Sequence, residues 1–354
     1  MRSIHCKRKK KEEYFKPMKI AIDCRWSGKS GIGAFFDGIL PYLKKSTNEL
    51  FLFGTNEIPC AVKTFSVKEI FCFPRNLLKE INKCDVYFTP YCNIPGGIKI
   101  PIYTTIHDVV FLDIPKLASK LGIFVRKIFY KRAIKKSRAL FTVSEFSKGR
   151  IIKTLHCKKP IFVVHNALPE YLLNFDISQI KKTNSILFVG NIKKHKGLSI
   201  LLDAFPSIYE KTGAKLLIVG SQEHFRTQDR SIEAKIDDIN VHTNNSIEFT
   251  GFVENERLKT VLASSRILVQ PSLYEGFGRP PLEALTTGTN AVISDIEVFH
   301  EIYDDFPVIF FKSGDSADLA EKVIHAWDFP PPVAIPQKYS FEKTANSMLE
   351  ILKQ

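Results

Sequence analysis

Short apolar runs separated by stretches of helical length fill most of this chain. The runs lie at 18–23, 85–89, 101–106, 140–144 and 161–164, and again at 185–190, 215–220, 247–253, 267–270 and 291–294. Nearly continuous apolar runs of this kind are typical of parallel strands that are buried on both faces. Between them lie segments with helical spacing, such as the one through Phe35, Ile39 and Leu43. Strands that alternate with helices predict an α/β fold with parallel sheets.

The two groups of runs predict two domains, and 354 residues are enough for each to bury its own core. The polar stretch 176–184 separates the two groups, and we predict that it is the linker between the domains. We therefore predict an N-terminal domain over 18–175, a C-terminal domain over 176–340 and a closing helix over 341–352. Residues 1–17 form a basic, polar extension that we expect to be disordered. It is either a solvated tail without function or a weak lipid tether.

The run 267–270 leads into the most informative stretch, 271–288. Glu275-Gly276-Phe277-Gly278 supplies two glycines for a sharp turn, and prolines at 280 and 281 suit the first turn of a helix. The free amides and positive dipole end of that helix predict an anion site. Glu275 and Glu283 bracket it, and because they would repel a phosphate, we expect them to bind sugar hydroxyls. The alternative is a capped helix with two solvated glutamates, which the clustering of all these features disfavours.

The string Glu275-Gly-Phe-Gly-x-Pro-Pro-Leu-Glu283-Ala resembles the signature of the retaining glycosyltransferase family 4, the glycosyl transferases group 1. The resemblance covers roughly 18–352 and is strongest over 247–304. It implies the GT-B fold, in which two doubly wound Rossmann-like domains face each other across a cleft. The first domain would hold the acceptor and the second the nucleotide sugar, and the helix 341–352 would cross back to the first domain.

The resemblance also implies roles for individual residues of this turn and helix. Glu275 would sit by the donor sugar, and Glu283 would bind the ribose hydroxyls. The amides at Phe277 and Gly278 would approach the sugar, and those near Leu282 would approach the diphosphate.

The loop after the run 185–190 resembles the segment that offers an arginine and a lysine to the donor diphosphate. Lys196 matches the lysine, although a loop lysine is by default solvated, so its role depends on the resemblance. Asn191 stands where an arginine is common. Lys194 or Arg279 could supply the second cation.

Two further features of the first half are expected at the donor site. The glycine-rich segment 27–33 lacks the third glycine of a dinucleotide loop and the spacing of a P-loop, so alone it is a weak signal. It resembles a family loop that closes over the donor phosphates, with Gly31 and Gly33 matching. A histidine after a strand is more often structural, but ligands of open α/β sheets bind beyond the strand ends. His107 is similar to the family histidine that contacts the donor sugar, so we favour a catalytic role.

Charge is distributed unevenly along the chain. The net charge is +14, and residues 1–170 carry 32 Lys and Arg against 13 Asp and Glu. Nucleic acid and an anionic membrane are both candidate partners of this basic half. Residues 116–138 carry nine Lys and Arg and no acid, with apolar residues at helical spacing at 117, 121, 124, 128 and 134. They predict either a basic amphipathic helix on a membrane surface or a domain helix with a solvated basic face. The absence of acids favours lipid.

A nucleic-acid-binding protein is the rival from another class. Base recognition needs aromatic residues interleaved with bases on an open face, or a recognisable module. Phe124, Phe129 and Tyr130 fit a lipid-facing or core stripe better, so we expect no nucleic acid.

Several common features are missing from the sequence. The seven cysteines form no C-x-x-C pair and predict reduced thiols in a cytosolic protein. No Asp-x-Asp occurs, so we expect no metal that bridges the diphosphate through that motif. We expect no other cofactor either, apart from the nucleotide sugar as co-substrate. No apolar stretch is long enough to span a membrane, and no signal peptide is visible. We expect a cytoplasmic protein, peripheral at the inner face of the cell membrane.

The resulting prediction is a retaining, metal-independent glycosyltransferase. It would move a hexose or deoxyhexose from a nucleotide sugar to a growing, lipid-linked or oligosaccharide cell-surface glycan, as mannosyl- and rhamnosyltransferases of lipopolysaccharide or capsule biosynthesis do. Glu275 would position the sugar for front-face attack rather than act as a nucleophile. A nucleotide-sugar epimerase and a phosphorylase of the same fold are alternatives, and the Glu275–Glu283 motif argues against both.

Overall fold

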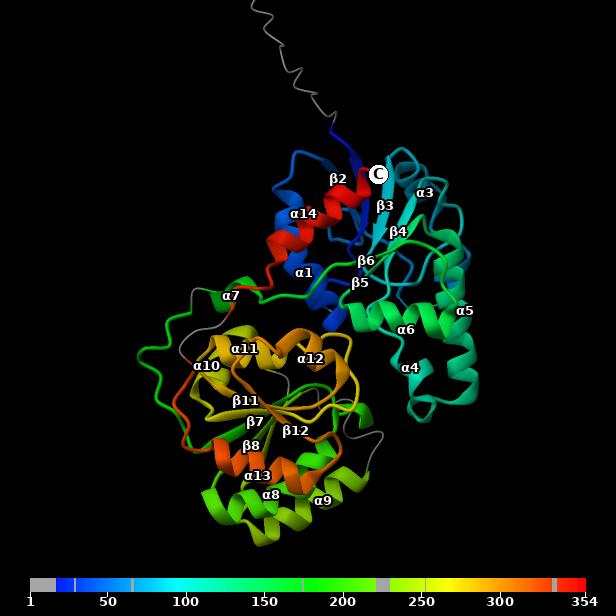
Figure 1. Ribbon diagram of the computed structural model, residues 1–354. Coiled ribbons are helices and arrows are strands. Elements are labelled where there is room, and N and C mark those ends of the chain that lie inside the picture. Colours follow the sequence, from blue (N-terminus) through cyan, green and yellow to red (C-terminus); the bar gives the residue numbers. More distant parts are fainter. Residues whose placement is uncertain are drawn as a thin grey trace, which may run out of the picture.

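The computed structural model describes residues 17–28, 30–64, 67–173, 175–220, 230–251, 253–332 and 336–354. The extension predicted over 1–17 lies, except for its last residue, outside the described residues. The described chain forms two α/β domains that face each other end to end (Figure 1).

The N-terminal domain is built on a parallel sheet with the strand order β2-β1-β3-β4-β5-β6. Its strands are β1 Lys19–Asp23, β2 Glu49–Phe53, β3 Val86–Thr89, β4 Ile102–Thr105, β5 Ala139–Thr142 and β6 Ile161–Val163. Its helices are α1 Ser30–Lys44, α2 Val67–Phe71, α3 Arg75–Ile81, α4 Val110–Asp113, α5 Lys120–Lys136, α6 Glu145–Leu155 and α7 Glu170–Leu173, with a 3-10 turn at Pro115–Leu117.

The C-terminal domain is built on a second parallel sheet with the order β12-β11-β10-β7-β8-β9. Its strands are β7 Ser185–Val189, β8 Lys215–Val219, β9 Ile247–Gly251, β10 Ile267–Gln270, β11 Asn290–Ser294 and β12 Val308–Phe311. Its helices are α8 Leu198–Thr212, α9 Arg230–His242, α10 Asn255–Ser264, α11 Pro280–Thr286, α12 Glu297–Tyr303 and α13 Ser316–Ala326, with a 3-10 turn at Lys194–Lys196.

Both sheets are doubly wound, because each grows in one direction from its first strand and then in the other. The reversal falls between β1 and β3 in the first sheet and between β7 and β10 in the second. Ligands of such sheets bind beyond the carboxyl ends of the strands at this switch point. The topology therefore predicts a binding site at the ends of β7 and β10.

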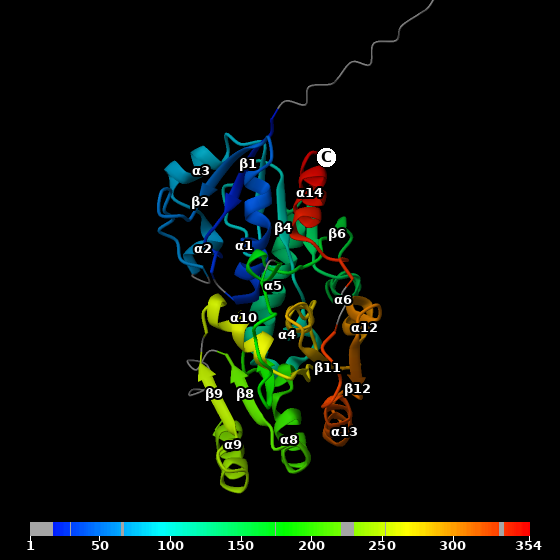
Figure 2. The same cartoon turned by 90° about the vertical axis from the view of Figure 1, so that its left-hand side faces the viewer.

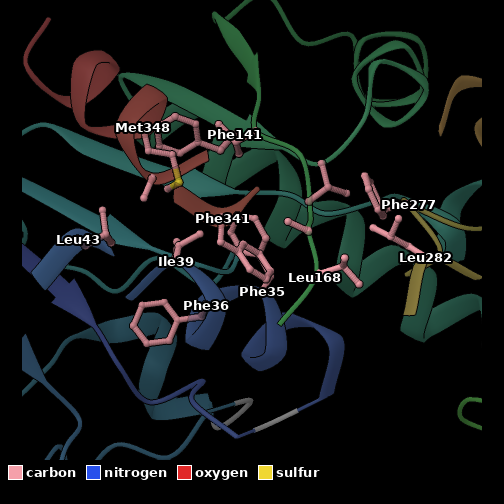
Figure 3. Close-up of a cluster of buried hydrophobic side chains, with 14 of the residues drawn as sticks. Phe35, Phe36, Ile39, Leu43, Phe141, Leu168, Phe277, Leu282, Phe341 and Met348 are labelled. Atoms are coloured by element: carbon pink, nitrogen blue, oxygen red, sulfur yellow. The ribbon is translucent and has the colours of Figure 1, made fainter. Parts of the chain in front are cut away.

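The last helix, α14 Phe341–Leu352, leaves the second domain and packs against α1 of the first (Figure 1). Gly38 makes room for it, since a Cβ at that position would lie 2.3 Å from the Phe341 ring. The hydrophobic cluster around this contact runs from Leu43 on α1 to Phe277 and Leu282 of the second domain (Figure 3). One buried cluster thus spans both domains, beside clusters that are confined to each of them.

The start of α1 differs from the prediction of a glycine loop over 27–33. The helix already begins at Ser30, so Gly31 and Gly33 lie in its first turn. The carboxylate of Asp37 accepts hydrogen bonds from the Ser27 hydroxyl at 2.6 Å and the Gly28 amide at 2.8 Å, which turns the chain directly into the helix. Gly33 packs on the chain that precedes it: a Cβ there would lie 2.3 Å from the Trp26 carbonyl.

Helix α5, predicted from residues 116–138, turns much of its apolar stripe to solvent. Tyr130 and Ala133 are its buried residues. Four apolar residues spaced along one face are exposed by 71%, 61%, 40% and 51%, and we call them the α5 stripe: Leu121, Phe124, Val125 and Ile128. A core helix would bury these positions. No helix in the described part of the chain is long and apolar enough to cross a bilayer.

Candidate active site

Two loops meet at the switch point of the C-terminal sheet. One follows β7 and contains the 3-10 turn Lys194–Lys196, and the other follows β10 and leads into α11. Gly197 lets them touch, because a Cβ at that position would lie 1.7 Å from the Pro271 carbonyl oxygen. The Leu273 amide also donates to the His195 carbonyl at 2.8 Å. The sequence prediction of strand 267–270 is confirmed to the residue.

Glu275 and Lys196 are in direct contact in this site. The Lys196 ammonium lies 2.7 Å from both carboxylate oxygens of Glu275. The same carboxylate accepts from the Ser272 hydroxyl at 2.8 Å and from the Gln270 amide nitrogen at 3.1 Å. Glu275 is buried, with 7% of its surface exposed. The predicted sugar-binding acid is thus neutralised by the predicted diphosphate-binding lysine, which reduces its repulsion of a phosphate.

Glu283 forms a second such pair one turn into α11. It is buried, and the Arg279 guanidinium four residues earlier donates to its carboxylate. Arg279, one of two candidates for the second cation, is therefore already paired. Lys194, the other candidate, is exposed, and no carboxylate pairs with it in the ranges that the structure describes. Asn191 is partly buried and carries no charge.

The glycine turn between these acids touches both domains. Gly278 has φ +79°, and a Cβ there would lie 2.2 Å from the Phe299 ring, so this position requires glycine. Gly276 faces the first domain, where a Cβ would lie 3.1 Å from the His107 carbonyl oxygen and 3.3 Å from Asp108. The turn predicted from the sequence thus also makes the contact between the domains.

Two residues of the turn and helix are partly occupied by other contacts. The Phe277 ring is buried against Tyr339, with ring centroids 5.2 Å apart. The Leu282 amide, predicted near the diphosphate, donates to the Tyr303 hydroxyl at 3.2 Å, and that hydroxyl donates to the Gly278 carbonyl. A diphosphate at Leu282 would compete with Tyr303. Nothing in the sequence pattern singled out Tyr303.

His107 follows β4 and meets the glycine turn from the first domain. Its Nε2 lies 3.0 Å from the Pro90 carbonyl oxygen, which can only accept. Nε2 therefore carries the proton, and Nδ1 of the neutral ring is an acceptor. Burial lowers the pKa of His107 to about 4, so the ring is neutral at pH 7. The structure thus places His107 beside the Glu275 turn, whereas Gly31 and Gly33 lie in α1.

A carboxylate that the sequence analysis missed joins the domains beside this turn. Asp113 accepts from the Tyr274 hydroxyl at 2.9 Å, from Arg150 at 2.7 Å through two nitrogens, and from Thr154 at 3.0 Å. Burial raises the pKa of Asp113, but the hydrogen bonds from Arg150 and Tyr274 outweigh it and hold the pKa below its ordinary value. Tyr274 precedes Glu275, so this cluster ties the donor turn to the first domain.

Helix α6 provides a second contact between the domains, beside α12 (Figure 2). Its first amides, of Glu145 and Phe146, donate to the Glu301 carboxylate of α12 at 2.8 and 2.7 Å. Ser144 caps the helix, and its hydroxyl also donates to the Gly276 carbonyl at 2.6 Å. These three hydrogen bonds therefore hold the two domains together here. No three metal-ligating side chains gather anywhere in the described ranges.

The second domain matches a known protein family. Residues 173–339 match the family described as Glycosyl transferases group 1. The O-antigen chain mannosyltransferase RfbU of Salmonella typhimurium is 25% identical over 203 residues, which are 56% of this chain and 53% of that protein. The phosphatidyl-myo-inositol mannosyltransferase of Mycobacterium leprae is 31% identical over 146 residues, 40% and 36% of the two chains. Alignments to three of the curated relatives span 53–59% of their length.

Solved structures resemble this chain over nearly its full length. Anabaena HepE, in complex with UDP and glucose, superposes with a TM-score of 0.69 at 15% identity over 95% of this chain and 99% of that one. Sucrose-phosphate synthase from Thermosynechococcus elongatus gives 0.65 at 15% identity over 95% and 94%. At this identity the likeness concerns the fold, and it confirms the predicted GT-B architecture of two facing Rossmann-like domains.

Proposed function

Because residues 173–339 match the glycosyl transferases group 1, we propose that the chain belongs to this family and transfers a sugar from a nucleotide sugar to a cell-surface glycan. The observation that carries the proposal is the convergence of Glu275, Lys196 and Glu283 at the switch point of the second sheet. The sugar would be a hexose or deoxyhexose, and the names of two relatives, both O-antigen chain mannosyltransferases, support mannose.

The donor would lie across the two loops. Glu283 would accept from the ribose hydroxyls, and Glu275 and the Nδ1 of His107 would accept from sugar hydroxyls. Lys196 and Lys194 would face the diphosphate. Lys196 can serve both partners, because an ammonium has three donors and Glu275 does not use all of them.

The reaction would proceed with retention, by front-face attack in which the leaving phosphate takes the acceptor's proton. Charge that develops on the diphosphate would be met by Lys196 and by backbone amides of the glycine turn. Glu275 would position the sugar. A carboxylate that already holds an ion pair and two further hydrogen bonds is a weak nucleophile, because attack requires it to give up these contacts. No metal or other cofactor enters this scheme.

The acceptor would be lipid-linked, and the enzyme would work at the cytoplasmic face of the membrane. The α5 stripe is flanked by four exposed lysines, Lys120, Lys127, Lys131 and Lys135. Two other bases of α5 have structural partners: Arg132 donates to the Ile94 carbonyl and Lys136 to the Pro95 carbonyl, each at 3.2 Å. Each exposed lysine near an anionic leaflet contributes about 1 kcal/mol.

Thermal shift with GDP-, UDP-, dTDP- and ADP-sugars tests the donor site. A ligand at 100 times its Kd stabilises by about 2.7 kcal/mol, which shifts the melting temperature visibly. Glu283→Ala should weaken the responding nucleotide by roughly 1.5–3 kcal/mol, because two hydroxyls lose a charged acceptor. Glu350→Ala, an exposed glutamate on α14, is the control. If no nucleotide sugar stabilises the wild type, the proposal fails.

The responding donor then serves three further assays. The anomeric configuration of the product, read by NMR, tests retention, and undiminished turnover with a chelator tests metal independence. Conversion of the donor without an acceptor would instead indicate an epimerase, and a requirement for free phosphate would indicate a phosphorylase. A salt-dependent shift on DNA without any response to nucleotide sugars would favour the nucleic-acid-binding alternative.

A further inference from the structure

A cavity of about 440 Å³ lies in the first domain between α5 and the segment 91–93. Its walls include Leu121, Val125 and Phe129, and Tyr91 and Arg126 also line it. This volume lies within the range of small-molecule sites, which are mostly apolar with a few placed polar groups. None of the residues assigned to the donor lines it.

Arg126 gives this cavity a positive charge that nothing in the described chain neutralises. Its guanidinium lies over the Phe111 ring, 4.0 Å from the centroid, which leaves its N–H edge for a ligand. Helix α5 contains no acid, and no carboxylate pairs with Arg126 in the ranges that the structure describes. An arginine that is stacked on a ring and lacks an acidic partner suits a phosphate, which its planar fork binds through two hydrogen bonds.

The apolar wall continues out of the cavity. Leu121 and Val125 line it and also belong to the α5 stripe, where they are exposed by 71% and 40%. One apolar surface therefore runs from the cavity to the outside of the helix, with a single cation inside. The matching ligand is a hydrocarbon chain that carries one anionic head.

The cavity is connected to the active site through the chain. Tyr91 follows Pro90, whose carbonyl oxygen accepts from His107 at 3.0 Å. The Phe111 ring under Arg126 also has the Lys193 ammonium of the second domain 5.6 Å from its centroid. A ligand that fills the cavity would therefore contact the segment that orients His107.

The wall formed by segment 91–93 is held in place from behind. Asn93 donates to the Glu69 carboxylate at 2.8 Å, and Arg25 pairs with the same carboxylate at 2.9 Å. All three side chains are buried. Contacts of this kind preorganise this wall of the site.

We propose that this cavity binds a lipid phosphate, the phosphate-linked hydrocarbon on which the acceptor glycan is carried. Arg126 binds the phosphate, and the α5 stripe, to which Leu121 and Val125 belong, binds the hydrocarbon. The assignment rests on the proposed glycosyltransferase function, because it places the anchor of the acceptor beside the catalytic histidine.

Calorimetry on the full chain with farnesyl phosphate as the probe, below its aggregation limit and without vesicles, tests the assignment. Farnesol, which lacks the phosphate, and inorganic phosphate, which lacks the hydrocarbon, are titrated separately for comparison. The wild type should bind farnesyl phosphate about tenfold more tightly than farnesol, since a charge-assisted bidentate contact is added. Arg126→Gln should lose that factor, and Val125→Trp, which fills the cavity, should lose binding of both lipids.

The matched control is Lys127→Gln, the neighbouring exposed base that does not line the cavity. It should bind farnesyl phosphate as the wild type does. Equal losses in Lys127→Gln and Arg126→Gln would mean diffuse attraction to the basic helix and would overturn the proposal, as would wild-type affinity in Arg126→Gln. Circular dichroism melting checks that each variant is folded.

This assay contains no nucleotide sugar and requires no turnover. A chain that binds farnesyl phosphate but responds to no nucleotide sugar would refute the proposed function alone. A chain that responds to a nucleotide sugar but not to farnesyl phosphate would refute the lipid-phosphate site alone.

Discussion

Glu301→Gln should open the cleft between the domains. In the structure the Glu301 carboxylate accepts from the first two amides of α6, at 2.8 and 2.7 Å. Glutamine keeps the length of the side chain but has one accepting oxygen, and its NH₂ group would face the other amide. The change removes one charge-assisted hydrogen bond, weakens the second and loses a favourable charge at a helix N-terminus.

The expected cost is about 1–2 kcal/mol, because a charged hydrogen bond contributes about 1.5–3 kcal/mol and this side chain is partly exposed. The contact links α6 of one domain to α12 of the other. Its loss therefore raises the free energy of the closed arrangement, in which the two domains touch, relative to the open one. A loss of that size reduces the ratio of closed to open molecules roughly 5- to 30-fold.

Two measurements follow this change. The kcat/KM for the nucleotide sugar should fall by a similar factor if catalysis needs the closed cleft, and small-angle scattering should show a larger radius of gyration. Glu297→Gln on the same helix is the control, because Glu297 is exposed. Wild-type scattering together with wild-type kcat/KM in Glu301→Gln would refute the reasoning.

Three further predictions concern the active site. Glu275→Gln and His107→Ala should lower turnover far more than affinity for free nucleoside diphosphate, measured by titration; a large loss of nucleotide affinity would place them in another subsite. Gly278→Ala should lower the free energy of unfolding by about 1–3 kcal/mol in urea denaturation, since it forces a side chain to a positive φ and against the Phe299 ring, whereas Gly31→Ala, with open space around it, should cost little. The folded-state pKa of His107, about 4, lies below the unfolded value of 6.5, so the unfolded chain binds the proton more tightly and stability falls as pH drops from above 6.5 toward 4, by up to about 3 kcal/mol. His107→Gln should therefore lose stability less steeply than the wild type between pH 7.5 and 4.5, and equal slopes would contradict the assignment.

The strands and helices of the site could be predicted from the sequence wherever a local pattern of residues determines them. Strand β10 is a run of buried residues, and α11 begins with two prolines, so both follow from neighbours along the chain. The start of α1 does not follow from neighbours along the chain. The Asp37 side chain accepts hydrogen bonds from Ser27 and Gly28, and the helix therefore begins within the glycine-rich segment. A contact of this kind between a side chain and distant backbone leaves no periodic signal.

The hydrogen-bond and ion-pair partners of the site residues could not be predicted from the sequence. Lys196 and Glu275 are 79 positions apart, and Asp113 and Tyr274 are 161 apart. The family signature indicates which residue types stand at the loops, but the pairing depends on how the two domains approach each other. The spacing of apolar residues in α5 was equally insufficient to predict how the helix packs. It predicted an apolar stripe, and only the packed structure shows that Leu121 and its neighbours face outward.

The two ion pairs change the electrostatic argument for donor binding. The sequence alone suggested that acids beside an anion site must repel phosphate, but Glu275 and Glu283 are each neutralised, by Lys196 and Arg279. Those two cations are then also unavailable for long-range attraction of the diphosphate. Lys194 is an exposed charge that remains there, and it is screened beyond about 8 Å at physiological ionic strength. Donor affinity should therefore come from short contacts made after the cleft closes, and it should depend less on salt than the attachment of the basic α5 face to lipid.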